Sequence, residues 1–326
     1  NDFVRMREVA ENNLERGTVL VTGASGFVGS AVTRALRQRG NVVRAAVRRA
    51  TEGDTCTMPP LEVLGDWYPL LSNCRVIVHV AARVHQPTDR TLNALSTFRA
   101  INMAGTLHLA QQAAVSGVSR FIFLSTIGVN GSVSVRPLVE QDPVCPDLPY
   151  AQTKWEAEQR LWQLGRQTGM EIVVIRAPLV YGPRAPGNFG LLARAVALGW
   201  PLPFASIVDN RRTMIGLDNL VDLIIAGIDN QAAANQLFLA GDNESLSTAE
   251  ILRRMARVLG KKSRCFPFPP LWLDAFLCGL GKGSMARGLC RSLEVDNTKA
   301  RRLLGWQPRF SVDQGLALAL REQAKE

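Results

Sequence analysis

The chain has 326 residues, 47% of them hydrophobic and 20% charged, with a net charge of +10 and a mean hydropathy of +0.03. This balance excludes an intrinsically disordered chain, and Gly and Pro follow no collagen-like period. The apolar runs are shorter than a membrane-spanning helix needs. We therefore expect a soluble globular protein of one or two domains, with no stable membrane insertion.

The charged residues and cysteines narrow the class of partner. Basic doublets are scattered and aromatic residues make up 6% of the chain, whereas nucleic-acid binding favours a basic stripe with aromatics between the charges. The six Cys and three His show no metal-ligand spacing. We expect no nucleic-acid partner, no bound metal, free thiols and a cytoplasmic location. A small anionic ligand is still consistent with the basic net charge. Residues 1–17, with Met6 as a candidate start, are expected to form a frayed arm.

In the first half, short β-branched runs alternate with helical patterns. Uninterrupted Val/Ile runs separated by helices are typical of a parallel sheet buried on both faces. The alternation predicts an α/β fold with a Rossmann-type, doubly wound parallel sheet. The expected strands are 18–23, 41–47, 61–65, 75–82, 121–125 and 171–177, and the expected helices are 26–39, 91–117 and 148–168.

The second half is less regular and mostly helical. It contains an expected strand at 236–241 and expected helices at 190–199, 247–259, 269–280, 296–304 and 311–323. We predict a dinucleotide-binding domain at 18–182 with a returning segment at about 212–241. A smaller, mostly helical C-terminal substrate lobe would comprise 183–211 and 242–326.

The segment 269–283 of this lobe is strongly apolar. We expect it to pack on the lobe, because it is short, contains Asp274 and lacks a basic polar face. A membrane-surface helix is the alternative.

A glycine-rich turn follows the first strand in the sequence TGASGFVG. Gly23 permits a tight turn, Gly26 lets the backbone approach a ligand, and Gly29 lets the helix pack on the strand. A helix N-terminus at this place presents free N–H groups to an anion. The strand–turn–helix context predicts a site for the pyrophosphate of a dinucleotide.

Further motifs occur in a fixed order along the chain. They are Gly65-Asp66, His79-Val80-Ala81-Ala82, Asn102 with Gly105-Thr106, Tyr150-x-x-x-Lys154, Arg176-Ala177-Pro178, Val180-Tyr181-Gly182-Pro183 and Leu304-Gly305-Trp306-Gln307-Pro308. Together with the glycine turn they cover residues 18–312. This set resembles the extended branch of the short-chain dehydrogenase/reductase superfamily, and in particular its NAD-dependent epimerase/dehydratase family.

The resemblance implies a nicotinamide dinucleotide cofactor. It places Phe27, Ala81, Asn102, Lys154 and Pro178 at the cofactor, with Asp66 bound to the adenine. An acid at the end of the second strand would bind the ribose 2′-hydroxyl, but this chain has Arg48 and Arg49 there. Because arginine can pair with a 2′-phosphate, the sequence favours NADP(H) over NAD(H).

The candidate catalytic residues are Tyr150, Lys154 and Thr126. Tyr150 and Lys154 are four residues apart in an expected helix and share a face. A nearby ammonium is expected to lower the phenol pKa from its usual value of about 10, so that Tyr150 can exchange a proton with a sugar hydroxyl. The family places a catalytic Ser or Thr at the end of the fifth strand, which matches Thr126. Ser125 is the alternative and would point to the other face of the strand.

The resemblance also implies a UDP-sugar substrate. Asn188 matches the family's UDP-sugar loop, and Arg212 matches the arginine that meets the diphosphate, which arginine can bind in bidentate fashion. Arg287 or Arg291 is expected to be a second contact. The motif Val129-Asn130-Gly131, where V-Y-G is usual, resembles UDP-4-keto-6-deoxy-N-acetylhexosamine reductases of bacterial surface-polysaccharide synthesis.

We therefore expect a C4 reductase, with a UDP-glucose-type 4-epimerase as the main alternative. A steroid- or flavonoid-type reductase and a non-enzymatic dinucleotide sensor are weaker alternatives, because Asn188, Arg212 and the catalytic residues are all present. The sequence is also compatible with a homodimer. A 4,6-dehydratase is not expected. Family dehydratases carry an Asp-Glu pair directly after the threonine, whereas Thr126 is followed by Ile127-Gly128, and the nearest acids are Glu140 and Asp142.

Overall fold

The computed structural model describes residues 17–50, 54–84, 94–281 and 283–321, so the expected arm, apart from Gly17, lies outside the described residues. The chain forms two compact units. Unit 1 comprises residues 1–129, 146–176 and 223–238, and unit 2 comprises 130–145, 177–222 and 239–326. Residues 130–145 lie within the range predicted for the dinucleotide-binding domain but group with unit 2, as do residues 212–222 of the predicted returning segment.

Unit 1 is built on a sheet that has seven strands within the described residues, in the order β3-β2-β1-β4-β5-β6-β9. Pairing is parallel between β1 and β2, β1 and β4, β2 and β3, and β4 and β5. The strands are β1 (Thr18–Thr22), β2 (Val43–Val47), β3 (Thr55–Thr57), β4 (Cys74–His79), β5 (Arg120–Thr126), β6 (Glu171–Ala177) and β9 (Gln236–Leu239).

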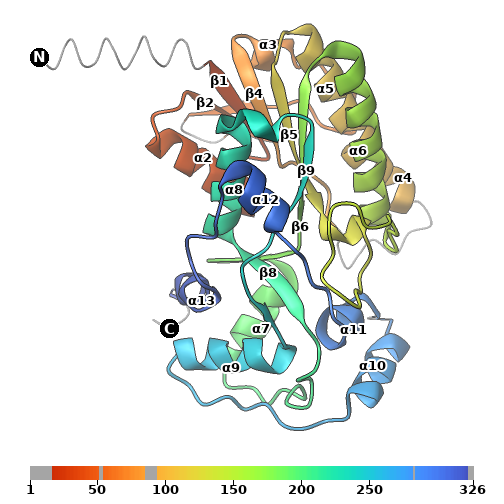
Figure 1. Ribbon diagram of the computed structural model, residues 1–326, viewed down its shortest axis with the longest axis vertical. Coiled ribbons are helices and arrows are strands. Elements are labelled where there is room, and N and C mark those ends of the chain that lie inside the picture. Colours follow the sequence, from red (N-terminus) through yellow and green to blue (C-terminus); the bar gives the residue numbers. More distant parts are fainter. Residues whose placement is uncertain (1–16, 51–53, 85–93, 282, 322–326) are drawn as a thin grey trace, which may run out of the picture. The chain divides into compact units, whose positions relative to one another are not determined.

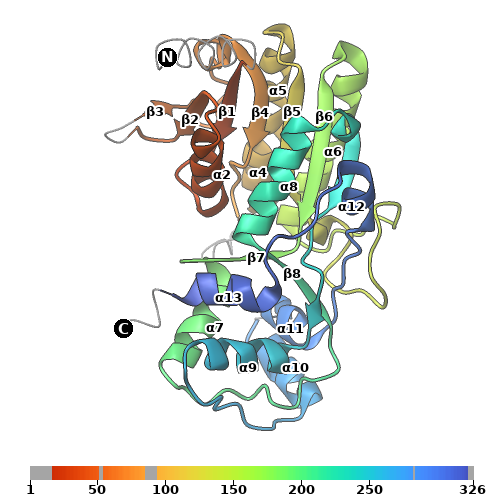
Figure 2. The same cartoon turned by 60° about the vertical axis from the view of Figure 1, so that its left-hand side comes forward.

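Helices cover both faces of this sheet. They are α2 (Phe27–Gln38), α3 (Tyr68–Leu71), α4 (Ala94–Phe98), the π-helix η1 (Arg99–Gly105), α5 (Thr106–Val115), the 3-10 helices η2 (Ile127–Val129) and η3 (Gln231–Ala233), α6 (Pro149–Thr168) and α8 (Leu217–Asp229), which begins in unit 2. Figures 1 and 2 show α2 and α8 on one face and α5 and α6 on the other. This arrangement confirms the predicted doubly wound α/β fold.

The strand residues explain why the sheet is covered on both sides. Val21, Ile77 and Phe121, from β1, β4 and β5, are fully buried. Such continuous apolar strands need helices on both faces. The sheet order reverses between β1 and β4, so the carboxyl ends of these two strands mark the switch point at which ligands bind in folds of this type.

One predicted strand of unit 1 is wrong. Residues 61–65 form a turn and an extended segment instead of a strand, and the strand beside β2 is the earlier β3. Val63 and Leu64 are exposed, so the apolar run had no second face to bury. The helical stretch expected at 91–117 is confirmed for residues 94–115, where α4, η1 and α5 follow one another without a break, while residues 91–93 lie outside the described residues.

Unit 2 is mostly helical, as expected, but also contains a small sheet that the sequence pattern did not predict. Its described helices are α7 (Gly187–Ala197), α9 (Thr248–Val258), α10 (Pro270–Gly279), α11 (Gly283–Cys290), α12 (Thr298–Leu304) and α13 (Val312–Leu320). Strands β7 (Leu179–Tyr181) and β8 (Arg212–Gly216) pair in parallel, and β10 (Ser245–Leu246) pairs antiparallel with β8. α13 packs on this sheet and on α9, which also contacts α7.

The apolar segment predicted at 269–283 contains α10, which packs on its neighbour but leaves large side chains exposed. α10 contacts α11 and buries Leu273, but Leu271, Trp272 and Phe276 are exposed. The expected packing of a helix on the lobe is therefore confirmed by the contact with α11, but most of the apolar surface of α10 stays exposed. Among the helices that the structure describes, none combines the length and apolar character needed to cross a bilayer.

Candidate functional site

The glycine turn brings the backbone at the end of β1 close to the start of α2. Gly23 has a φ of +70°, which L side chains rarely adopt. A Cβ built on Gly29 would lie 2.1 Å from the carbonyl oxygen of Gly23, so only glycine permits this approach. Gly26 is exposed at the N-cap of α2. These residues fit the pyrophosphate of a dinucleotide, which the first N–H groups of α2 would bind.

The end of β4 lies directly against this turn. A Cβ on Gly23 would lie 2.9 Å from the Cα of Ala81, which is buried, while Phe27 is half-buried at the start of α2. Arg48 and Arg49 are exposed where β2 ends. In unit 1, the residues predicted to bind the phosphates and the ribose of the cofactor thus lie at the carboxyl ends of neighbouring strands.

Asp66 and Pro178 have different surroundings. Asp66 is exposed, and its carboxylate accepts a hydrogen bond of 2.9 Å from the backbone N–H of Tyr68 at the start of α3. Pro178 is buried directly after β6 and belongs to unit 2. Their predicted contacts with the cofactor stay predictions.

Asn102 binds the protein backbone. It is buried in η1, where its Nδ2 donates to the carbonyl of Arg83 at 3.0 Å and its Oδ1 accepts from the N–H of Arg83 at 2.8 Å. This pair of bonds fixes the segment that follows β4. The Nδ2 of Asn102 also donates to Oγ1 of Thr153 on α6 at 3.4 Å, and the predicted contact of Asn102 with the cofactor stays a prediction.

The candidate acid–base pair lies on α6. Tyr150 is half-buried in the first turn, and Lys154 is buried one turn later. Burial raises the pKa of Tyr150 to about 12, in the direction opposite to the effect expected from Lys154. Burial also lowers the pKa of Lys154 to about 7, against the opposing attraction of Glu158. At neutral pH the phenol therefore keeps its proton.

Lys154 rests on an aromatic stack. Its Nζ lies 3.8 Å from the ring centroid of Phe123 on β5, and the ring of His79 stacks on Phe123 at 6.0 Å with an interplanar angle of 11°. Hydrogen bonds of 2.8 and 2.9 Å join the His79 ring nitrogens to the hydroxyls of Thr22 and Thr106. Burial lowers the pKa of His79 to about 3. The lysine therefore has an apolar, neutral floor.

The structure distinguishes between Thr126 and Ser125. Thr126 is half-buried at the end of β5, and its Oγ1 accepts a bond of 3.2 Å from the N–H of Gly128. Ser125 is buried and donates to a carboxylate oxygen of Glu158 at 2.5 Å. Since successive strand residues point to opposite faces, Thr126 is the better candidate for a ligand contact.

Glu158 and its partner Arg176 were not predicted as site residues. The guanidinium of Arg176 pairs with the Glu158 carboxylate at 2.6 Å, and both side chains are almost fully buried. The network joins β5 beside Thr126, α6 below Lys154, and the end of β6. The available signal was spacing, because Tyr150, Lys154 and Glu158 recur every four residues on one face of α6.

In unit 2, α11 brings the predicted substrate residues together. The guanidinium of Arg212 on β8 donates to the carbonyls of Arg287 and Arg291 at 3.4 and 3.2 Å. A Cβ on Gly288 would lie 3.8 Å from Nδ2 of Asn188 on α7. Burial lowers the pKa of Arg212 to about 10, which leaves it charged at neutral pH. Arg291 is exposed and pairs with Asp274 at 2.8 Å, so Arg287 is the better second candidate.

In the part of the chain that the structure describes, no three His, Cys, Asp or Glu side chains gather as they would around a metal ion. The residues predicted for catalysis and for phosphate binding offer hydroxyl, amine, guanidinium, amide and backbone groups. These groups suit proton exchange and the binding of phosphates more than metal coordination.

Comparisons with known proteins agree with a dinucleotide-binding site in unit 1. The family model described as "NAD dependent epimerase/dehydratase family" matches residues 19–241. A UDP-glucose 4-epimerase of Vibrio cholerae is 38% identical over 304 residues, covering 91% of this chain and 93% of the relative. A UDP-glucose 4-epimerase of Mycolicibacterium smegmatis is 28% identical and covers 91% and 96%.

Solved structures share the fold. The UDP-glucose 4-epimerase of Thermotoga maritima with UDP-glucose has a TM-score of 0.77 and 24% identity, covering 94% of this chain and 99% of that one. The UDP-glucuronic acid 4-epimerase of Bacillus cereus in complex with NAD has a TM-score of 0.77 and 20% identity, covering 94% and 97%. The match of the family model, the fold and the glycine turn lead to one conclusion: this chain belongs to the NAD-dependent epimerase/dehydratase family.

Proposed function

We propose that the chain is a nicotinamide-dependent oxidoreductase that acts at C4 of a UDP-hexose. The observation that carries the proposal is the position of Thr126 at the end of β5, against which α6 packs with Tyr150 and Lys154. Relatives named UDP-glucose 4-epimerase, and a solved structure that holds UDP-glucose, support this class of substrate.

The residues have separate roles in this reaction. The bound cofactor supplies or accepts hydride at C4. Tyr150, whose pKa is near 12, carries a proton at neutral pH and gives it to the C4 oxygen when a ketone is reduced. The Thr126 hydroxyl donates a hydrogen bond to the same oxygen, and Lys154 holds the cofactor ribose. Reduction of the carbonyl thus consumes one hydride and one proton and yields one alcohol.

The preferred form of the activity is reduction of a UDP-4-keto-6-deoxy-N-acetylhexosamine. It rests on Asn130, where tyrosine is usual in the family. Asn130 is buried, and its Nδ2 donates to the carbonyls of Asp142 and Pro143 at 3.3 and 3.4 Å. Asn130, which differs from the usual tyrosine, therefore helps to fix the backbone of segment 130–145. UDP-glucose 4-epimerisation is the second candidate, favoured by the 38% identical relative.

The UDP moiety is assigned to unit 2. Arg212 is charged and half-buried, and Arg287 is half-buried on α11 beside it. Two guanidinium groups near Asn188 suit the two phosphates of a nucleoside diphosphate. Of the two cofactors we propose NADP(H), because Arg48 and Arg49 are exposed at the end of β2, where an acid would otherwise bind the 2′-hydroxyl.

A product assay separates the two candidates. The purified protein is incubated with NADPH and the UDP-4-keto-6-deoxy-N-acetylhexosamine, and separately with UDP-glucose, and the sugars are analysed by NMR. A reductase consumes one NADPH for each 4-hydroxyl formed, whereas an epimerase forms UDP-galactose with no net change in cofactor. Turnover of neither substrate, in protein that binds the dinucleotide, would contradict the proposal.

A further inference from the structure

The outward side of α10 is an exposed apolar surface. Leu271, Trp272, Phe276 and Leu280 are 78, 72, 62 and 52% exposed, and we call these four residues the α10 face. Large apolar side chains gathered at one exposed place mark a binding surface. A helix that is apolar on nearly all sides is ordinarily buried, yet α10 buries only Leu273 fully.

The one charged residue of α10 does not interrupt this face. Asp274 is mostly buried, and its carboxylate pairs with Arg291, just beyond the end of α11, at 2.8 Å. Because α10 contacts α11 on this side, the charge is turned away from the α10 face. The outward surface therefore carries no group that needs an aqueous or charged partner.

The residues that precede and follow α10 in the sequence carry a net positive charge. Residues 251–293 contain nine Lys or Arg and one acid, Asp274, a net charge of +8 in a chain of +10. Arg253 and Arg254 form ion pairs with Glu250. Lys261, Lys262 and Arg264 are exposed on the segment that leads from α9 to α10.

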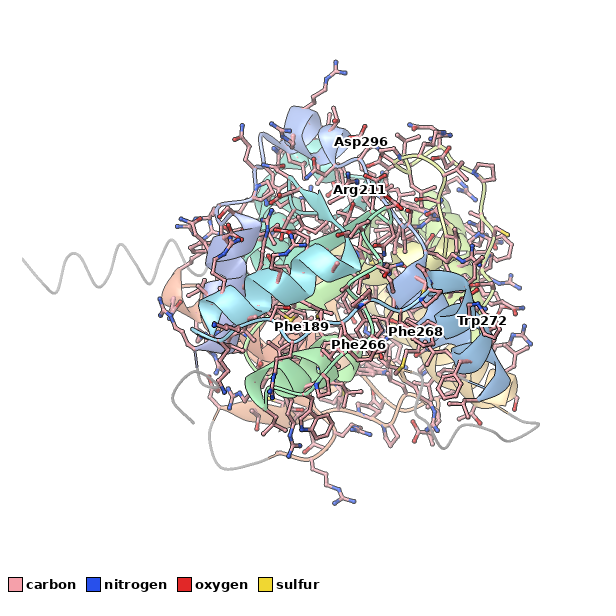
Figure 3. All side chains as sticks on the ribbon, turned by 90° about the horizontal axis from the view of Figure 1, so that it is seen from below. Phe189, Arg211, Phe266, Phe268, Trp272 and Asp296 are labelled. Atoms are coloured by element: carbon pink, nitrogen blue, oxygen red, sulfur yellow. The ribbon has the colours of Figure 1, made fainter. Side chains whose placement is uncertain are left out.

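Aromatic residues accompany these lysines at the same end of unit 2. Phe266, before α10, is 42% exposed, and Trp200, after α7, is 60% exposed. Their segments are neighbours, since the N–H of Phe266 donates to the carbonyl of Leu202 at 2.9 Å. Figure 3 looks onto this end, with Phe266 and Phe268 on the segment before α10 and Trp272 on α10.

We propose that the α10 face, with the basic segment 257–264, docks unit 2 on the anionic surface of a lipid bilayer. This inference goes beyond the proposed reaction. A ten-residue helix is too short to span a bilayer but can lie in the headgroup region. Trp, Phe and Leu then enter the acyl boundary, and the lysines meet anionic headgroups. The cationic border favours a lipid surface over a second copy of this basic chain.

Vesicle flotation of the full chain tests the proposal. Wild-type protein is expected to float with vesicles of phosphatidylcholine mixed with phosphatidylglycerol, and to remain unbound with phosphatidylcholine alone. Trp272→Ser with Phe276→Ser should lower the partition coefficient about tenfold or more. Lys261→Glu with Lys262→Glu should lower it too, and added salt should weaken wild-type binding.

A matched control removes exposed apolar side chains elsewhere. Val115 and Val135 are 76 and 102% exposed, and Val115→Ser with Val135→Ser should leave flotation unchanged. Thermal unfolding checks that every variant is folded. If the wild-type protein does not float with vesicles that contain phosphatidylglycerol, the proposal is wrong. It is also wrong if the control and test variants lose vesicle binding to the same extent. A lipid-free oligomer that the Trp272/Phe276 variant converts to monomer would also overturn it, because the face would then be a self-association surface.

Discussion

The hydroxyl of Ser125 donates to the carboxylate of Glu158 at 2.5 Å, directly before Thr126 in the chain. The same carboxylate pairs with Arg176 at 2.6 Å. Glu158 thereby connects the strand end that carries Thr126 with the helix that carries Tyr150 and Lys154. This charge pair is almost fully buried and joins the elements that carry the candidate catalytic residues.

Removing one member of this pair should destabilise the fold. Glu158→Ala leaves Arg176 buried without its carboxylate, and we expect the free energy of unfolding to fall by about 3–5 kcal/mol. Urea denaturation measures the loss. Asp229→Ala is the control, since its pair with Arg39 is about half exposed on both sides and should contribute only about 0–1 kcal/mol. Equal losses in the two variants would show that the buried pair has no special weight.

Tyr150→Phe should remove turnover and keep the fold. The variant lacks only the hydroxyl that would exchange a proton with the C4 oxygen, so we expect kcat to fall by about 10²-fold or more. Steady-state kinetics give the value, and calorimetry of dinucleotide binding checks that the cofactor site is intact. Near-normal kcat would remove Tyr150 from the catalytic assignment.

His79 should make the protein sensitive to acid. Its pKa is about 3 in the folded chain and about 6.5 when unfolded, so between these values the unfolded state binds more protons. Stability therefore falls as pH drops from about 6.5 toward 3, by up to about 1.4 kcal/mol per pH unit from this group. His79→Gln does not titrate and should show a flatter dependence in denaturation at several pH values. An unchanged slope would assign the acid sensitivity to the carboxylates.

Arg48→Ala with Arg49→Ala tests the cofactor proposal. Loss of charged bonds to a 2′-phosphate should weaken NADPH binding by about 1.5–3 kcal/mol and leave NADH binding unchanged. Isothermal calorimetry with both dinucleotides compares the two. If both affinities fall together, these arginines do not distinguish the cofactors.

The chain should not act as a 4,6-dehydratase. Elimination across C5–C6 needs an acid and a base beside Thr126, but Ile127 is buried and apolar and Gly128 has no side chain. The acids that follow next in the sequence are engaged elsewhere: Asp142 binds Arg136 at 2.5 Å, and Glu140 accepts from the N–H of Leu239 at 3.1 Å. Glu158, which accepts from Ser125, is buried in its ion pair with Arg176. NMR of a reaction with UDP-N-acetylglucosamine and NAD⁺ should show no 6-deoxy-4-keto sugar. Its formation at a catalytic rate would prove this prediction wrong.

Sequence patterns predicted the parts of the site that depend on local geometry. The turn at Gly23 and Gly29 follows from backbone sterics, and the alternation along β5 predicted opposite faces for Ser125 and Thr126. The pKa of Tyr150 could not be predicted in the same way. The effect of Lys154 was judged from spacing alone, whereas burial by the folded chain dominates.

Properties that depend on tertiary packing were also missed. The outward side of α10 looks the same in sequence as a buried helix, because both are apolar, and only its exposure distinguishes them. The basic residues were judged as scattered doublets, although most of the net charge lies in 251–293. The role of Glu158 depends on where β5 and β6 lie beside α6, and the spacing of residues along one helix does not give this information.

The π-helix η1 corrects the phase of a long helical stretch. Phe98, Asn102, Thr106 and Ala110 are all buried, and each follows the last by four residues. In an uninterrupted α-helix the first and last of these would point about 120° apart, since each residue turns by about 100°. The wider turns of η1 absorb this drift. One side of the stretch can therefore bind two separate partners, with Asn102 holding the backbone of Arg83 and Thr106 holding the ring of His79.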